Sequence, residues 1–193
     1  MFLKDFFPNL NHEFKNVFFS GITFNSNRVK KGNIFFAIKG NNFNGNDYIE
    51  KAIYRGAKVI ISEQKKIKNK DVIFIPTKNI RKLLAEVSYK ISENKLDKLV
   101  AVTGTNGKSS IADFYYQILN LNSKKVASIG TIGVKYKDKK KTLSNTTLDP
   151  IQLSSILKNL KKQKIEYVIM EASSHGLKQN RLDGLSFDIG IFT

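Results

Sequence analysis

The sequence predicts an α/β protein of two domains, 1–96 and 97–193. Short apolar runs of strand length alternate with segments whose apolar residues recur at helical spacing. In the second half, a glycine-containing loop lies between an apolar run and a helical pattern, as in nucleotide-binding sheets. We therefore expect a small N-terminal α/β domain followed by a mostly parallel sheet with helices on its faces.

The first domain is expected to hold short strands and two helices. Continuous apolar runs bounded by glycine or proline predict strands at 33–38, 57–62 and 72–75. Helical spacing predicts a helix over 47–55 that ends at Gly56, and an amphipathic helix over 79–91. The polar stretch 92–95 follows, and the domain boundary is placed there.

The second domain shows the strand–helix alternation of a parallel sheet. The predicted strands are 99–102, 126–129, 167–170 and 187–192, the last of them a buried type of strand, and a hairpin is expected around the lysine-rich run 135–141. Helices are predicted over 111–119 and from 150 onward. Asp149 suits the N-cap of the second helix and Pro150 its first position.

The charge and composition narrow the function classes. The formal net charge is +17, but the two halves carry +9 and +8, so the charge is not concentrated in one tail. The lysine-rich runs 65–70 and 135–141 fall where turns are expected and are interpreted as solvated loops. No nucleic-acid partner is expected, although the positive field could attract an anionic substrate.

Cysteine is absent, and no stretch approaches the length of a membrane span. The N-terminus lacks the apolar segment of a secretory signal. A monomeric cytoplasmic protein without membrane insertion is expected.

The segment 102–110 predicts an ATP site. Its loop residues are Gly104, Thr105, Asn106, Gly107, Lys108, Ser109 and Ser110. Glycines let backbone N–H groups close around a polyphosphate, and the helix N-terminus adds partial positive charge. Lys108 is placed to neutralise the outer phosphates and the Ser109 hydroxyl to bind Mg²⁺. The loop is a variant of the Walker A string, because Val102 occupies the position of the first glycine.

Glu171 directly follows the apolar run 167–170. A carboxylate at the carboxyl end of a strand, in a sheet that also holds a phosphate loop, predicts a Mg²⁺ ligand or a water-orienting group. We prefer this to a surface glutamate at the start of a loop because the phosphate loop is present.

Two further polar segments leave alternatives open. Ser173, Gln179 and Arg181 either bind an anionic ligand or lie on a helix surface, and the Ser-His pair 174–175 lacks the elbow motif of a hydrolase. Asn145, Thr146 and Thr147 precede the helix at Pro150, where they either line a substrate groove or form a turn and cap.

Together these motifs resemble the muramyl ligases of peptidoglycan synthesis. The resemblance covers nearly all of the chain. It rests on the segments 22–26 and 29–40, the loop 104–110, Asn145-Thr146-Thr147, and the string 170–177 with Gln179 and Arg181. The resemblance implies an ATP- and Mg²⁺-dependent amide ligase. It would add a third amino acid, in most bacteria meso-diaminopimelate, to UDP-N-acetylmuramoyl-L-alanyl-D-glutamate through an acyl phosphate.

The resemblance also implies residue roles. Lys108 and Glu171 would be catalytic, with Ser109 and Glu171 at Mg²⁺, and the first domain would bind the UDP part of the substrate. The substrate residues would be Phe24, Ser26, Asn41, Asn42, Phe43, Asn145, Thr146, Thr147, Ser173, Gln179 and Arg181.

The same resemblance implies that the second domain is truncated, so the chain is expected to be an inactive N-terminal fragment. A sister ligase that adds D-alanyl-D-alanine and a folate polyglutamate ligase fit the motifs less well. From another class, a basic nucleotide-binding module without ligase activity remains an alternative.

Overall fold

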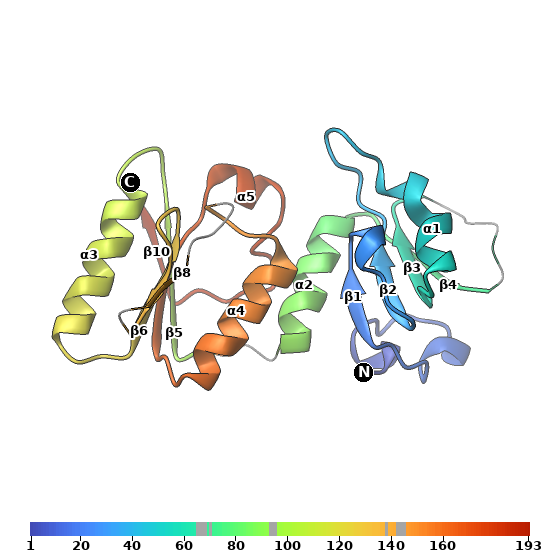
Figure 1. Cartoon of the computed structure of the whole chain (residues 1–193), viewed down its shortest axis with the longest axis horizontal. Helices are drawn as coiled ribbons and strands as arrows, with labels where there is room; N and C mark the ends of the chain where they lie inside the picture. Colours follow the sequence, from blue (N-terminus) through green and yellow to red (C-terminus); the bar gives the residue numbers. More distant parts are fainter. Residues whose placement is uncertain (65–68, 70, 93–95, 138, 142–145) are drawn as a thin grey trace. The chain divides into compact units, whose positions relative to one another are not determined.

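The computed structural model describes residues 1–64, 69, 71–92, 96–137, 139–141 and 146–193. The chain divides into two compact units, Met1–Val87 and Ser88–Thr193, each with its own sheet (Figure 1). The predicted α/β class with parallel sheets is confirmed. The division falls inside helix α2 (Ile80–Ser92). The domain boundary after residue 96 stays a prediction.

The first unit is built on a four-stranded parallel sheet. Its strands, in spatial order, are β1 (Gly21–Thr23), β2 (Asn33–Phe36), β3 (Val59–Ser62) and β4 (Ile73–Pro76). Strands β2 and β3 are buried along their whole length, which is why their sequences are continuously apolar. The predictions of these two strands and of β4 are confirmed, whereas β1 escaped prediction because three residues carry no periodic signal.

Helix α1 (Ile49–Tyr54) packs its buried Ile49 and Ala52 into a core with Phe35 and Ile60. The predicted helix 47–55 begins instead as a 3₁₀ turn and becomes α-helical at Ile49. Gly56, with φ of +93°, ends it as expected. The short 3₁₀ helices of this unit are η1 (Leu3–Asp5), η2 (His12–Phe14), η3 (Ser26–Arg28) and η4 (Gly45–Tyr48).

The second unit contains a six-stranded mixed sheet. Its strands, in spatial order, are β10 (Ile189–Phe192), β5 (Lys98–Thr103), β9 (Tyr167–Glu171), β6 (Val126–Gly130), β7 (Gly133–Tyr136) and β8 (Lys139–Lys141). The first four are parallel, and β6, β7 and β8 pair antiparallel. The hairpin expected around the lysine-rich run is therefore confirmed.

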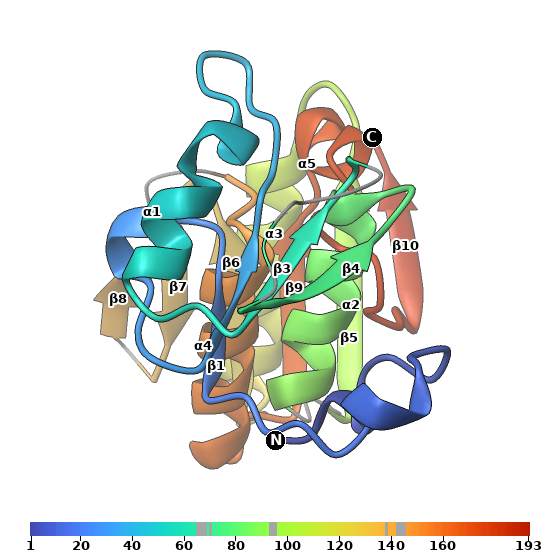
Figure 2. The same ribbon diagram turned by 90° about the vertical axis from the view of Figure 1, so that its right-hand side faces the viewer.

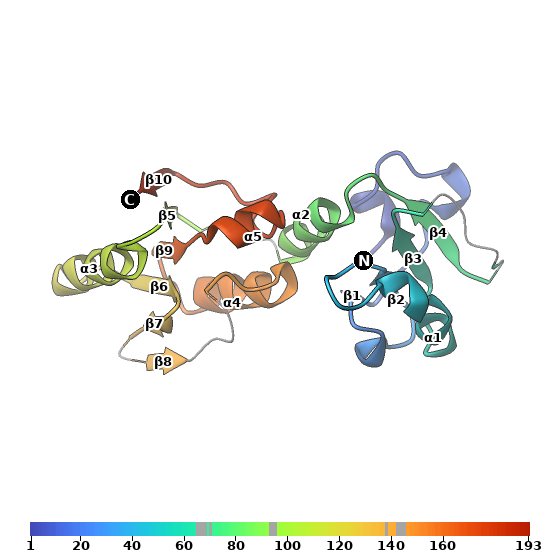
Figure 3. The ribbon, with the colours of Figure 1, turned by 90° about the horizontal axis from the view of Figure 1, so that it is seen from above.

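Helices cover both faces of this sheet (Figure 3). Helix α3 (Lys108–Leu121) lies on one face, where Ala112 packs with Val100, Val102 and Ile169. Helices α4 (Pro150–Lys162) and α5 (Ser174–Lys178) lie on the other. Asp149 caps α4 as predicted, because its carboxylate accepts a hydrogen bond from the Gln152 N–H at 3.0 Å.

Strand β10 corrects one expectation. The apolar run 187–192 was expected to be a buried strand, but β10 lies at the edge of the sheet beside β5 (Figure 2). The side chains of Ile189 and Phe192 are 51% and 85% exposed. An apolar run cannot by itself distinguish a central strand from an edge strand that shares its pattern.

None of the helices in the described parts of the chain has the length and apolar character of a membrane span.

Candidate active site

Three loops meet at the carboxyl edge of the second sheet. The loop 104–107 follows β5, Thr131 follows the last residue of β6, Gly130, and Glu171 is the last residue of β9. These strands are parallel neighbours, so their carboxyl ends share one edge. Ligands of α/β sheets bind at this edge.

The loop 104–107 has the backbone of a phosphate cradle. Gly104 and Gly107 have φ of +136° and +77°, and a Cβ on Gly104 would lie 1.9 Å from the carbonyl oxygen of Thr193. Glycine is therefore needed at Gly104. Helix α3 begins at Lys108 with Gly107 as an N-cap that offers no side-chain acceptor, so its first N–H groups face the loop.

The side chains of the loop region point to an anion site. The Lys108 ammonium donates to the carbonyl oxygens of Gly104 at 2.7 Å and Thr105 at 3.2 Å, which holds the charge over the loop. Thr105, Asn106, Gly107 and Ser110 are exposed. A cation, a loop of exposed residues and a helix N-terminus together suit a polyphosphate.

Glu171 is 3% exposed and lies against the first turn of α3. Its carboxylate accepts hydrogen bonds from the Ser109 hydroxyl at 3.0 Å, the Thr131 N–H at 2.9 Å and the Thr131 hydroxyl at 3.0 Å. All three donors are neutral, and no Lys, Arg or His among the described residues forms an ion pair with it. The predicted closeness of Ser109 and Glu171 is thus present.

This donor set fits a magnesium ion. A buried carboxylate without a cationic partner is costly, and a cation would offset that cost. Mg²⁺ is commonly held by one or two carboxylates together with phosphate oxygens and water, and does not need a cage of protein ligands. No group of three or more His, Cys, Asp or Glu gathers within the described residues.

Gly130 and Thr131 belong to this site although the sequence did not single them out. A Cβ on Gly130 would lie 2.1 Å from Glu171 Oε1, so only glycine leaves room for the carboxylate. Gly130 ends the apolar strand β6 and Thr131 directly follows it, as Glu171 ends the apolar strand β9. A position at the carboxyl end of a predicted parallel strand could therefore have indicated Gly130 and Thr131 as well.

The segment at Thr146-Thr147 is held against Glu171. The Thr147 hydroxyl, which is buried, donates to the main-chain carbonyl of Glu171 at 3.2 Å and accepts from the Ser173 N–H at 3.0 Å. Ser173 also caps α5 by accepting from the Gly176 N–H at 3.1 Å. Gly176 leaves space for Thr147, since a Cβ there would lie 2.7 Å from Thr147 Cβ. Asn145 lies outside the described residues.

Arg181 is engaged by its own chain. Its guanidinium donates to Gln179 Oε1 at 2.8 and 3.1 Å and also to the carbonyl oxygen of Thr147. The Tyr89 hydroxyl on α2 donates to the carbonyl of Arg181 at 2.5 Å, and burial raises the pKa of this phenol well above its ordinary value. Arg181 and Gln179 therefore join Thr147 and Ser173 in one network.

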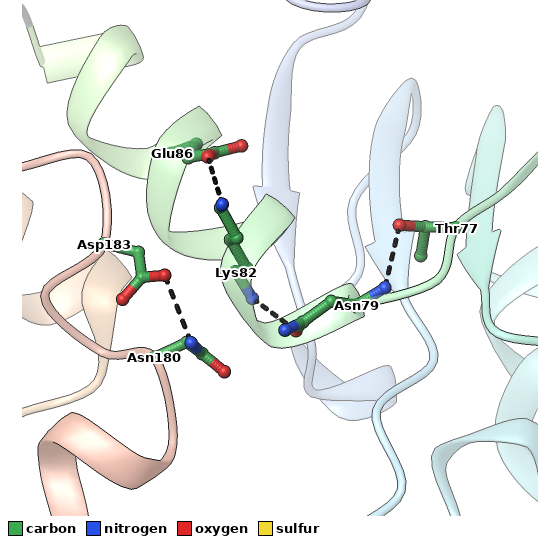
Figure 4. Close-up of polar contacts among 6 residues, drawn as sticks. All are labelled: Thr77, Asn79, Lys82, Glu86, Asn180 and Asp183. Carbon is green, nitrogen blue, oxygen red and sulfur yellow. Dashed lines mark hydrogen bonds and ion pairs between the residues drawn. The ribbon is translucent and has the colours of Figure 1, made fainter.

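A hydrogen bond joins two residues of the loop after α5. The Asn180 amide donates to the Asp183 carboxylate at 3.1 Å (Figure 4). On α2, within the first unit, Lys82 forms an exposed ion pair with Glu86 at 3.9 Å in the same view.

The remaining predicted site residues lie in the first unit. Phe24 follows β1, and Asn41, Asn42 and Phe43 follow β2, so both loops leave one edge of the parallel sheet. Phe24 and Phe43 are exposed, whereas Ser26 is buried in η3.

Two family descriptions match this chain. Residues 102–193 match "Mur ligase middle domain", and residues 19–90 match "Mur ligase family, catalytic domain". The first match spans the loop, Glu171 and the Thr147–Arg181 network, and together the two span most of the chain. The chain belongs to the Mur ligase family. Mur ligases are ATP-dependent amide ligases, and the loop at 104–110 lies within the part of the chain that matches the middle domain.

Several curated relatives of this Mur ligase chain carry the name UDP-N-acetylmuramoyl-L-alanyl-D-glutamate--2,6-diaminopimelate ligase. The protein from Rickettsia conorii is 41% identical, and the alignment covers 95% of this chain and 40% of the relative. That from Geobacillus thermodenitrificans is 35% identical, covering 87% of this chain and 34% of the relative. The chain thus spans about two fifths of the length of the curated relatives it matches.

Solved structures of Mur ligases resemble this chain. A structure of UDP-N-acetylmuramoyl-L-alanyl-D-glutamate--2,6-diaminopimelate ligase has a TM-score of 0.85 and 27% identity, covering 100% of this chain and 40% of its own. The MurF ligase from Thermotoga maritima in complex with ADP has a TM-score of 0.53 and 26% identity, covering 79% of this chain and 32% of its own.

Proposed function

We propose that this Mur ligase chain serves ATP-dependent amide-bond formation in peptidoglycan precursor synthesis. The reaction adds meso-diaminopimelate to UDP-N-acetylmuramoyl-L-alanyl-D-glutamate through an acyl phosphate. The observation that carries the proposal is the 3.0 Å contact between Ser109 and Glu171 beside a phosphate loop, with Thr147 hydrogen-bonded to the same Glu171.

The proposed division of labour follows from charge. The loop 104–107 and the ammonium of Lys108 bind the ATP phosphates and offset the negative charge that moves with the γ-phosphoryl group. Ser109 and Glu171 would hold Mg²⁺, which supplies further charge neutralisation. The substrate carboxylate then attacks the γ-phosphorus, the bond from this phosphorus to the β-phosphate oxygen breaks, and ADP leaves. The incoming amine attacks the carbonyl carbon of the acyl phosphate, and phosphate leaves as the nitrogen loses a proton.

We assign the substrate to two regions. Phe24, Ser26 and the loop 41–43 would contact the uridine part, the exposed phenyl rings supplying stacking surface. Thr146 and the network of Thr147, Ser173, Gln179 and Arg181 would hold the muramoyl-dipeptide, with Asn145 assigned by resemblance alone. Because Arg181 already binds Gln179 and Thr147, its proposed role is to shape that segment as well as to bind charge.

The sister ligase adding D-alanyl-D-alanine is less well supported. Relatives at 35–41% identity carry the diaminopimelate name, and the MurF structure superimposes with a TM-score of 0.53 against 0.85. The expected monomeric state, cytoplasmic location and absence of a nucleic-acid partner stay predictions.

Thermal unfolding with UDP-N-acetylmuramoyl-L-alanyl-D-glutamate tests the substrate assignment. A ligand that binds only the folded chain stabilises it by about 2.7 kcal/mol at 100 times its Kd, so the Tm should rise with ligand concentration. Free D-glutamate is the matched control and should leave the Tm unchanged.

No shift with the nucleotide substrate, combined with RNA binding that weakens steeply with salt, would instead favour the basic nucleotide-binding module.

A further inference from the structure

Thr131 gives two hydrogen bonds to one carboxylate. Its N–H donates to Glu171 Oε1 and its hydroxyl to Glu171 Oε2, at 2.9 and 3.0 Å. Two donors from one residue, one to each oxygen, fix the rotation of the carboxylate plane. The remaining donor to Oε2 is Ser109, whose hydroxyl lies 3.0 Å away.

The direction of these two hydrogen bonds also determines the donor in a third, between Thr131 and Thr146. An ionised carboxylate only accepts hydrogen bonds, so the Thr131 hydroxyl commits its single proton to Glu171. Thr131 Oγ1 lies 3.0 Å from Thr146 Oγ1, and Thr131 has no second hydroxyl proton to offer. Thr146 must therefore be the donor, and the order of donation runs from Thr146 to Thr131 to Glu171.

Thr131 approaches Glu171 from a different element than Ser109 does. It is the residue directly after β6, while Ser109 lies on α3 and Thr146 precedes α4. Gly130, immediately before it, allows the close approach of Glu171. The Glu171 carboxylate therefore accepts hydrogen bonds from two elements, from Ser109 on α3 and from Thr131 after β6.

We infer that Thr131 is a positioning residue: it sets the Glu171 carboxylate against Ser109 and links this pair to the segment at Thr146. The inference rests on the proposed function, in which Ser109 and Glu171 hold Mg²⁺ and Thr146 lies in the substrate segment. Residues that orient metal-binding carboxylates tune metal affinity without touching the metal. Thr131 therefore acts on the magnesium requirement of nucleotide binding.

The test is calorimetric titration of the 193-residue chain with ATP over a series of Mg²⁺ concentrations. Thr131→Val keeps the shape and the N–H but removes the hydroxyl, and it should raise the Mg²⁺ concentration for half-maximal ATP binding by about 10- to 100-fold. Thr131→Ser restores the hydroxyl and should match the wild type. ATP affinity without Mg²⁺ should be the same in all three proteins.

Ser128→Ala, on the same strand β6, is the matched control and should leave the Mg²⁺ requirement unchanged. An unchanged Mg²⁺ requirement in Thr131→Val would overturn the inference, and so would an equal loss of ATP affinity with and without Mg²⁺. If Thr131→Val does not fold, Thr146→Val takes its place, because it removes the donor to Thr131 and should raise the Mg²⁺ requirement in the same direction.

A nucleotide-free readout separates the two proposals. The carbon-13 resonance of the Glu171 carboxyl group should move in Thr131→Val and stay in place in Ser128→Ala. If the wild-type chain binds no ATP at all, the proposed function fails while this resonance still decides the role of Thr131. An unmoved resonance would overturn the inference even where ATP binds.

Discussion

At the scale of single residues, the site combines what a linear pattern can indicate with what only packing decides. Ser109 and Glu171 were predicted together because each follows a recognisable strand or loop signal, and they lie 3.0 Å apart. Hydrogen-bond partners across distant segments leave no such signal. Thr147 is predicted to line a groove or to form a turn, and Arg181 to bind an anionic ligand or to lie on a helix surface. The hydrogen bond from the Arg181 guanidinium to the Thr147 carbonyl follows from the fold and cannot be predicted from spacing.

Gly130→Ala tests the steric argument at Glu171. The new Cβ would lie 2.1 Å from Oε1, so the carboxylate must move, and we expect a loss of about 1–3 kcal/mol in the free energy of unfolding together with weaker Mg²⁺-dependent ATP binding. Gly190→Ala is the matched control, because nothing lies within 4 Å of its Cβ. Urea unfolding and ATP titration of both variants measure the effect. Equal behaviour of the two variants would contradict it.

At the scale of elements, strands and helices were predictable where burial and capping leave a pattern. Helix α4 begins at Pro150 because the Asp149 cap and the proline agree, and β2 and β3 are continuously apolar because both faces are buried. Strand β1 was too short to show a period. The edge position of β10 depends on strand order, which no local pattern contains.

Tyr116 on α3 and Tyr89 on α2 test how a buried hydroxyl with and without a hydrogen-bond partner affects stability. The buried Tyr116 hydroxyl has no hydrogen-bond partner among the described residues, whereas the Tyr89 hydroxyl donates to Arg181. Removing an unpaired buried hydroxyl relieves a desolvation cost, so Tyr116→Phe should raise the free energy of unfolding by about 1 kcal/mol. Tyr89→Phe should lower it by a similar amount, about 1 kcal/mol. Chemical denaturation measures the direction of both changes in the free energy of unfolding. Destabilisation by Tyr116→Phe would contradict the prediction that its hydroxyl is unpaired.

Asp188 gives the edge strand β10 a pH dependence. The Leu99 N–H and then the Lys98 ammonium hold the pKa of this carboxyl below its ordinary value of 3.8. The folded chain therefore binds this proton less readily than the unfolded chain. The contribution is present above the ordinary pKa and is lost as the pH falls through the lower folded pKa.

Asp188→Asn removes that contribution at every pH. The stability gap between wild type and variant should be constant above about pH 5 and close on acidification below it. Denaturation midpoints between neutral and acidic pH measure the gap. A gap that widens on acidification would contradict the assignment.

At the scale of the whole molecule, the two units divide the proposed work. The first carries the exposed phenyl rings after parallel strands, and the second carries the phosphate loop, Glu171 and the Thr147 network. The even spread of the +17 charge over the halves agrees with a general attraction of anions to both units. The fold class was predictable because strand–helix alternation is a property of the entire chain.

Calorimetric titration of the chain with ATP and Mg²⁺ tests the nucleotide site directly. Binding to a single site should occur in the wild type and disappear in Lys108→Ala, since the ammonium over Gly104 and Thr105 is the main cation of the loop. Lys124→Ala, at an exposed position after α3, should bind as the wild type does. Glu171→Gln should keep ATP binding but lose its dependence on Mg²⁺. No ATP binding by the wild type, or equal binding by Lys108→Ala, would contradict a nucleotide site at this loop.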